Sequence, residues 1–92
     1  MISADTKPRI ASKAMLRYDR LANRYMLLFP EKGLVLNPTA AEIAKLCTGE
    51  HTVAAMVAQL APRYDTDAAS IESEVMKFLT ALAERGLLEE VP

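Results

Sequence analysis

The chain has 92 residues, of which 51% are hydrophobic and 25% charged, proportions that fit one small globular domain with a single core. Its formal net charge of −1 gives no general attraction for nucleic acid. The charge is uneven, because residues 1–32 carry seven basic and three acidic groups whereas residues 33–92 carry four and nine. A basic N-terminal part would attract an acidic partner, although solvated strand faces give the same pattern.

A single cysteine, Cys47, excludes an internal disulfide and a cysteine-rich metal or iron–sulfur site. No apolar run is long enough to span a bilayer, and residues 1–10 lack the apolar centre of a signal peptide. We therefore expect a cytoplasmic protein that does not enter a membrane.

The N-terminal third predicts an antiparallel sheet. Residues 1–8 are expected to form a flexible arm, and residues 9–92 a single domain. Alternation predicts a strand over residues 9–19, and the aromatic and aliphatic run at 24–29 predicts a central strand with both faces covered. A turn is expected at residues 30–33, where proline fixes φ and glycine permits positive φ.

Residues 34–36 then predict a short third strand. Hairpin connections place the strand at 24–29 in the middle, so that residues 34–36 form an edge. This edge lacks the charged residues that usually prevent pairing with another chain. It is either covered by the fold or open to a ligand.

Three helices are expected to follow. The first begins near residue 39, capped either by the Thr39–Glu42 capping box or by Asn37 ahead of Pro38. The second runs from Thr52 to about Pro62. The third covers residues 67–85, and its apolar arc is wide enough for extra burial or for a second docking face. A last short strand or extension is expected at residues 87–88. The predicted class is α+β, winged-helix-like, with a three-stranded antiparallel sheet followed by three helices.

The sequence offers little support for a catalytic or metal site. His51 and Cys47 are the single histidine and the single cysteine, too few to complete a metal site of these residues; the three glycines are scattered, and no serine has an adjacent histidine base. We therefore predict no enzyme activity, no metal and no cofactor. The third helix carries two basic residues, Lys77 and Arg85, and four acidic ones. This negative balance disfavours binding to a nucleic-acid duplex.

Several segments, in order and spacing, resemble the pyrroloquinoline quinone biosynthesis protein D (PqqD) family. They are Arg17-Tyr18-Asp19, Leu27-Leu28-Phe29-Pro30-Glu31, Leu36-Asn37-Pro38-Thr39-Ala40-Ala41-Glu42-Ile43, Leu46-Cys47-Thr48-Gly49, Thr52-Val53, and the helix from Ile71 to Leu82 followed by Gly86-Leu87-Leu88. The resemblance spans about residues 9–90. Thr48 departs from it, since the family usually has Asp before the glycine.

The resemblance implies a precursor-peptide recognition domain without a cofactor. Such a domain binds the precursor peptide PqqA and presents it to the radical S-adenosylmethionine enzyme PqqE. It also implies that the peptide adds as a strand beside the third strand and leans on the third helix. The peptide-binding residues are then expected to be Leu34, Val35, Leu36, Asn37, Val75, Met76, Leu79 and Ala83.

Other interpretations remain open. The basic hairpin at Arg17, Arg20 and Arg24 is a candidate contact for the modifying enzyme, on charge alone. The edge at residues 34–36 could pair with a second copy to form a homodimer. Alternatives to peptide recognition are a winged-helix transcriptional regulator, a self-associating structural subunit, or a paralogue that serves another peptide.

Overall fold

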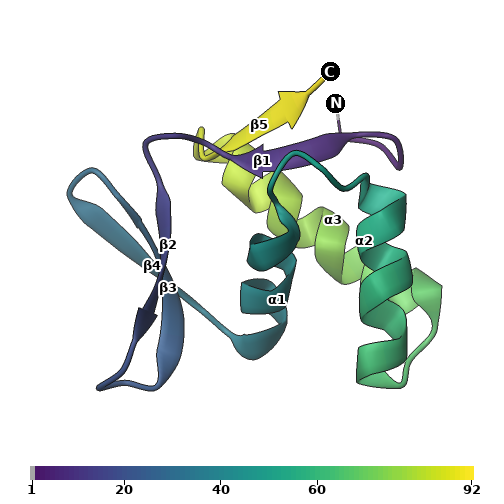
Figure 1. Ribbon diagram of the computed structural model, residues 1–92, viewed down its shortest axis with the longest axis horizontal. Helices are drawn as coiled ribbons and strands as arrows, with labels where there is room; N and C mark the ends of the chain where they lie inside the picture. Colours follow the sequence, from purple (N-terminus) through teal and green to yellow (C-terminus); the bar gives the residue numbers. More distant parts are fainter. Residues whose placement is uncertain (1) are drawn as a thin grey trace.

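A computed structural model of the protein describes residues 2–92. Figure 1 shows three helices on one side of a strongly twisted sheet, with both chain ends near a second, smaller sheet. The elements in chain order are β1 (Lys7–Ile10), β2 (Met15–Asp19), β3 (Arg24–Phe29), β4 (Lys32–Leu36), α1 (Pro38–Leu46), α2 (Val53–Leu60), the 3-10 helix η1 (Ala61–Tyr64), α3 (Ala68–Glu84) and β5 (Leu88–Val91). The predicted α+β, winged-helix-like class is confirmed, with one sheet more than expected.

The larger sheet has the order β2-β3-β4 and is antiparallel throughout. As predicted from the hairpin connections, β3 is the central strand. The turn between β3 and β4 is tighter than expected, because β4 begins at Lys32 and only Pro30 and Glu31 separate the strands. Glu31, not Gly33, adopts the positive φ, at 64°.

The smaller sheet pairs β1 with β5 and corrects the prediction for the N-terminal third. The expected strand over residues 9–19 is two strands, β1 and β2, which belong to different sheets. The loose arm expected at residues 1–8 is also wrong for its described part. Backbone N–H groups of Gly49, Val53 and Ala54 donate hydrogen bonds to the carbonyls of Pro8, Thr6 and Ala4. Met1 lies outside the described residues.

Side-chain caps position the three helices. The Asn37 side chain accepts from the Ala40 N–H and caps α1, which decides between the two alternatives in favour of Asn37 followed by Pro38. Thr52 caps α2, as its place at the predicted helix start indicated, and Asp67 caps α3 in the same way. No helix among residues 2–92 is long and apolar enough to cross a membrane.

The two faces of the larger sheet differ in burial. We define the inner face by Leu16, Leu27 and Leu34, which pack on α1 and α3 in the core, and the outer face by Met15, Arg17, Met26, Leu28 and Val35. The apolar residues of the outer face belong to neither core cluster. The prediction that β3 is covered on both sides is therefore wrong, since none of the elements formed by residues 2–92 covers the outer face (Figure 1).

Candidate functional site

The free edge of β4 is the first part of the candidate site. Within residues 2–92, no strand pairs with β4 on the side away from β3. The hairpin closes at the pair Phe29–Lys32 with two residues between them, so this pair is hydrogen-bonded, and the ladder alternates from there. Leu34 and Leu36 thus bond to β3, while Gly33 and Val35 direct their N–H and C=O groups outward. An extended peptide could pair with these groups.

A hollow of about 230 Å³ lies between the start of α1 and α3. The residues that line it are Asn37, Thr39, Ala40, Ile43, Glu74, Lys77 and Phe78. Asn37 directly follows the last residue of β4. The hollow therefore begins next to the end of β4. We call the β4 edge and this hollow together the edge groove.

The predicted residues of β4 are placed differently along the strand. Val35 is 48% exposed and lies on the outer face at the free edge. Leu34 is half-buried on the inner face and Leu36 is buried in the core. Asn37 lines the groove, but its side-chain oxygen is already engaged with the Ala40 N–H.

The predicted residues of α3 do not line the edge groove. Val75 and Leu79 are fully buried in the core and offer no exposed surface in this structure. Met76 and Ala83 line a different hollow of about 500 Å³. Its other lining residues are Ile2, Thr80, Glu84 and Glu90.

The α3 residues that line the edge groove thus differ from those expected from the sequence. The residues that face the edge groove are Glu74, Lys77 and Phe78, spaced at i, i+3 and i+4 on one helical face. Phe78 is half-buried and gives an apolar contact, while the other two are exposed and carry opposite charges. The spacing was visible in the sequence, but the charges made this face look like ordinary solvated surface.

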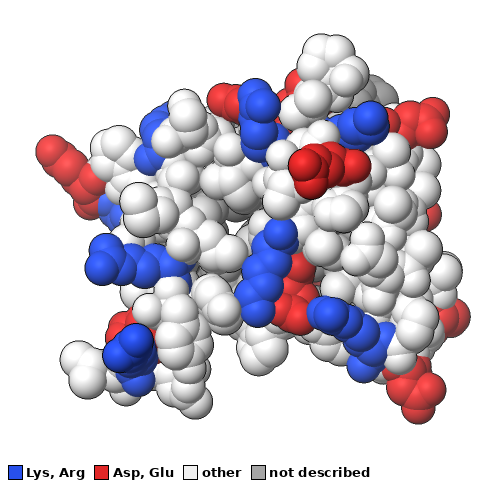
Figure 2. Space-filling model, in the orientation of Figure 1, with Lys and Arg blue, Asp and Glu red and all other residues white. Residues whose placement is uncertain are grey.

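The three arginines of the predicted basic hairpin do not line the same hollow. Arg17 and Arg20 line a hollow on the outer face of the sheet. Arg24 lines a different hollow, of about 310 Å³, which it shares with Tyr25 and with Glu42 of α1. Lys45 of α1 lies 4.4 Å above the Tyr25 ring, a cation–π contact that links this helix to β3. On the face drawn in Figure 2, Lys and Arg side chains extend over the sheet and across the centre.

Three titratable groups in α1 or at its end have shifted pKa values, among them Lys45, whose pKa is raised by its hydrogen bond to Glu42. The hydrogen bond from Lys45, together with the charges of Lys45 and Arg63, holds the pKa of Glu42 below its ordinary 4.5. Burial raises the pKa of the Cys47 thiol to about 12. The pKa shifts of Glu42 and Cys47 thus have structural causes, because Glu42 forms ion pairs and Cys47 is buried in the core. Among the residues that the structure describes, no group of three or more His, Cys, Asp or Glu side chains could hold a metal ion.

Known proteins resemble this chain over nearly its whole length. The family described as coenzyme PQQ synthesis protein D (PqqD) matches residues 24–88. The PqqA binding protein of Rhodopseudomonas palustris strain BisB5 is 37% identical, over 97% of this chain and 87% of its own.

Two solved structures share the architecture. The solution NMR structure of the PqqD truncation of Methylobacterium extorquens PqqCD, a stand-alone recognition element for ribosomally synthesized and post-translationally modified peptides, superposes with a TM-score of 0.82. It is 34% identical and covers 97% of this chain and 95% of its own. TbiB1 in complex with the TbiA(beta) leader peptide has a TM-score of 0.76, covering 88% and 94% of the two chains. At 22% identity it shows likeness of fold alone.

Proposed function

The chain belongs to the PqqD family, and on this premise we propose that it is a non-catalytic chaperone that binds the PqqA precursor peptide by strand addition to β4. The observation that carries the proposal is the free edge of β4, with outward backbone groups at Gly33 and Val35 beside the hollow on α3. PqqA is the peptide because relatives at 37% identity are PqqA binding proteins.

Strand addition gives affinity through the main chain. Gly33 and Val35 each offer one N–H donor and one C=O acceptor, so the added strand can make up to about four backbone hydrogen bonds. It would lie about 4.8 Å from β4, and its alternate side chains would point toward the helices. There Phe78 offers an apolar contact, and Glu74 and Lys77 offer charges of either sign. These three residues replace Val75, Met76, Leu79 and Ala83 as the proposed specificity contacts.

In this proposal the bound peptide is presented to the radical S-adenosylmethionine enzyme PqqE in the cytoplasm. The enzyme supplies all the chemistry, and the present chain holds the peptide in an extended form. The same β4 edge can pair with a second copy of the chain, so a homodimer and the bound peptide would compete for it.

The test compares two substitutions at one position. Val35→Pro removes the outward N–H without removing a hydrogen bond to β3, since proline is tolerated at edge positions that face away from the sheet. Val35→Ala keeps the N–H and removes the side chain. We expect Val35→Pro to weaken binding of synthetic PqqA about tenfold, and Val35→Ala to change it much less.

Binding is measured by calorimetry and by amide chemical shifts of isotope-labelled protein. Shifts are expected at residues 33–37 and at Glu74, Lys77 and Phe78. Unchanged affinity in a folded Val35→Pro variant, with shifts elsewhere, would contradict strand addition at β4.

A further inference from the structure

We propose that the outer face of the β2-β3-β4 sheet is the docking surface for the modifying enzyme, and that it takes an acidic segment of that enzyme carrying an exposed apolar side chain. This inference rests on the proposed function, because it concerns the partner to which the peptide is presented. It assigns that partner a surface separate from the edge groove.

Exposed apolar side chains are concentrated on this part of the molecule. Among residues 2–92, the large hydrophobic side chains that are clearly exposed are Met15 at 60%, Tyr18 at 43%, Leu21 at 100% and Val35 at 48%. Met15 and Val35 lie on the outer face and Leu21 lies on the β2–β3 turn, whereas Tyr18 shares the inner face with Tyr25; the helices contribute none. Met26 and Leu28, half-buried between Met15 and Val35, complete an apolar surface on the outer face. Contiguous exposed apolar surface of this kind marks interaction sites.

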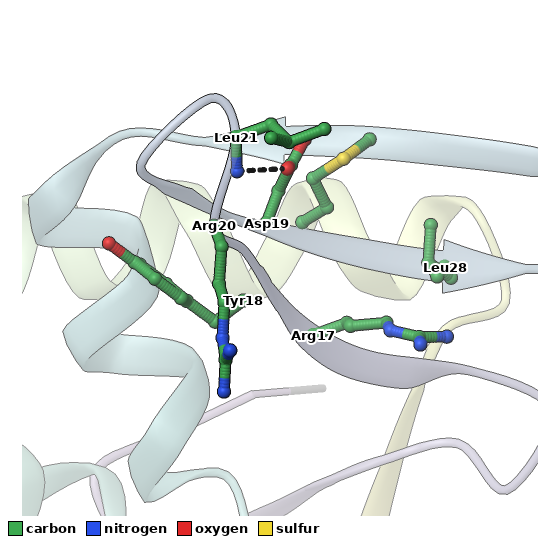
Figure 3. Close-up of a pocket in the computed structure, with 7 residues that line it drawn as sticks. Arg17, Tyr18, Asp19, Arg20, Leu21 and Leu28 are labelled. Carbon is green, nitrogen blue, oxygen red and sulfur yellow. Dashed lines mark hydrogen bonds between the residues drawn. The ribbon is translucent and has the colours of Figure 1, made fainter.

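A hollow of about 370 Å³ lies at one end of this face, below the β2–β3 turn. Met26 and Leu28 of β3 line it, and Leu21 lines it from the turn. In Figure 3 the Arg20 side chain extends downward from the hairpin and the Arg17 side chain extends toward Leu28, with Leu21 near the turn. The hollow is large enough for one apolar side chain of a partner.

The charge around the hollow determines the chemistry of the occupant. Neither Arg17 nor Arg20 forms an ion pair with another residue in the range 2–92. The one carboxylate beside them, on Asp19, accepts hydrogen bonds from the backbone N–H groups of Leu21 and Ala22 at 3.0 and 3.2 Å and so holds the turn. The guanidinium groups of Arg17 and Arg20 are therefore free to bind a partner. They favour a partner segment in which Asp or Glu lies beside an apolar side chain that fills the hollow.

The position of this face allows the peptide and the enzyme to bind together. The edge groove uses the outward backbone of β4 and the helical side of the sheet, whereas Met15, Met26 and Leu28 lie on the opposite side. Val35 stands where the two surfaces meet. Since strands are about 4.8 Å apart, the enzyme would contact the sheet within about 10–15 Å of the added strand.

Methionine methyl groups give a direct test. The protein is labelled at the methionine ε-methyl carbons and titrated with PqqE. We expect the Met15 and Met26 resonances to shift or broaden. Met56, which is buried in the core, and Met76, which lines the hollow of about 500 Å³, are internal controls whose resonances should not change. Shifts at Met76 without shifts at Met15 and Met26 would overturn the proposal.

Two independent variants quantify the contact. Leu21→Glu places a carboxylate at a fully exposed turn position, and Arg17→Glu with Arg20→Glu reverses the charge of the rim. Each is expected to weaken PqqE binding about tenfold or more and to leave PqqA affinity unchanged. Lys77→Glu, a matched charge reversal in the edge groove, should have the opposite pattern.

The outcomes separate the two proposals. If PqqE binds both outer-face variants as tightly as the natural chain, the docking surface is wrong and peptide presentation stands. If the natural chain binds PqqA but not PqqE, presentation fails and the docking proposal fails with it.

Discussion

Arg63 Nη1 donates a hydrogen bond of 2.6 Å to Glu42 Oε1, which ties the 3-10 helix η1 to the middle of α1. The other oxygen of the same carboxylate lies 2.8 Å from Lys45 Nζ, one turn along α1. Glu42 thus connects two elements, and its neighbour Lys45 continues the connection to the Tyr25 ring on β3.

Replacing Glu42 by Gln should lower the stability by less than about 1 kcal/mol at neutral pH, because the ion pairs are partly exposed. The pKa of Glu42 is lower in the folded than in the unfolded state, so its stabilising effect is present above 4.5 and is lost as the pH falls through the folded value. The difference between the two proteins should therefore shrink below pH 4.5 in urea unfolding curves. Glu50→Gln, at an exposed carboxylate without an ion pair in the described chain, is the control. An equal effect for both variants would contradict this account.

Leu27→Ala should be strongly destabilising, by about 2–5 kcal/mol, because Leu27 is fully buried on the inner face. Met15→Ala, on the outer face at 60% exposure, should change stability by only about 0.5 kcal/mol. The free energy of unfolding from denaturant titration checks both. A large loss for Met15→Ala would mean that the outer face is buried, for example in a homodimer, and the oligomeric state would then be measured by sedimentation.

Gly49→Ala should also be destabilising, by about 1–2 kcal/mol, because Gly49 has a φ of +86°. An added Cβ would lie 2.9 Å from Val91 Cγ2 of β5, in the segment that holds β1 and β5 against the helices. Gly33→Ala is the matched control, since its φ is ordinary and its new Cβ would meet flexible ends of Met26 and Leu28 at 3.1 and 3.2 Å. Faster amide exchange in β1 and β5 is expected for the first variant alone.

Cys47 should be unreactive toward thiol reagents in the folded protein. Its pKa is raised to about 12 by burial, so the thiolate that reacts is scarce near neutral pH, and its side chain is 4% exposed. Labelling by a disulfide reagent should proceed at the rate of unfolding and become fast in guanidinium chloride. Rapid labelling without denaturant would show that this end of α1 opens locally.

Much of the local structure was predictable from short-range chemistry. Thr52 and Asp67 have the side chains that cap helices, and Gly86, at a φ of +71°, follows the end of α3 as expected. The place of Val35 on a sheet edge followed from two consecutive hairpins. These features depend on residues a few positions apart, which is the range over which a sequence pattern carries information.

The sequence by itself thus determined the helices, the order of the larger sheet and the family. Only the tertiary structure decided that residues 7–10 leave this sheet to pair with β5, where Arg9 contacts Glu89, 80 positions away. It also decided which side of α3 faces the start of α1, burying Val75 and Leu79 and turning Lys77 and Phe78 to the groove. The physical reason is that a wide apolar arc permits several rotations of a helix, and packing against distant elements selects one of them.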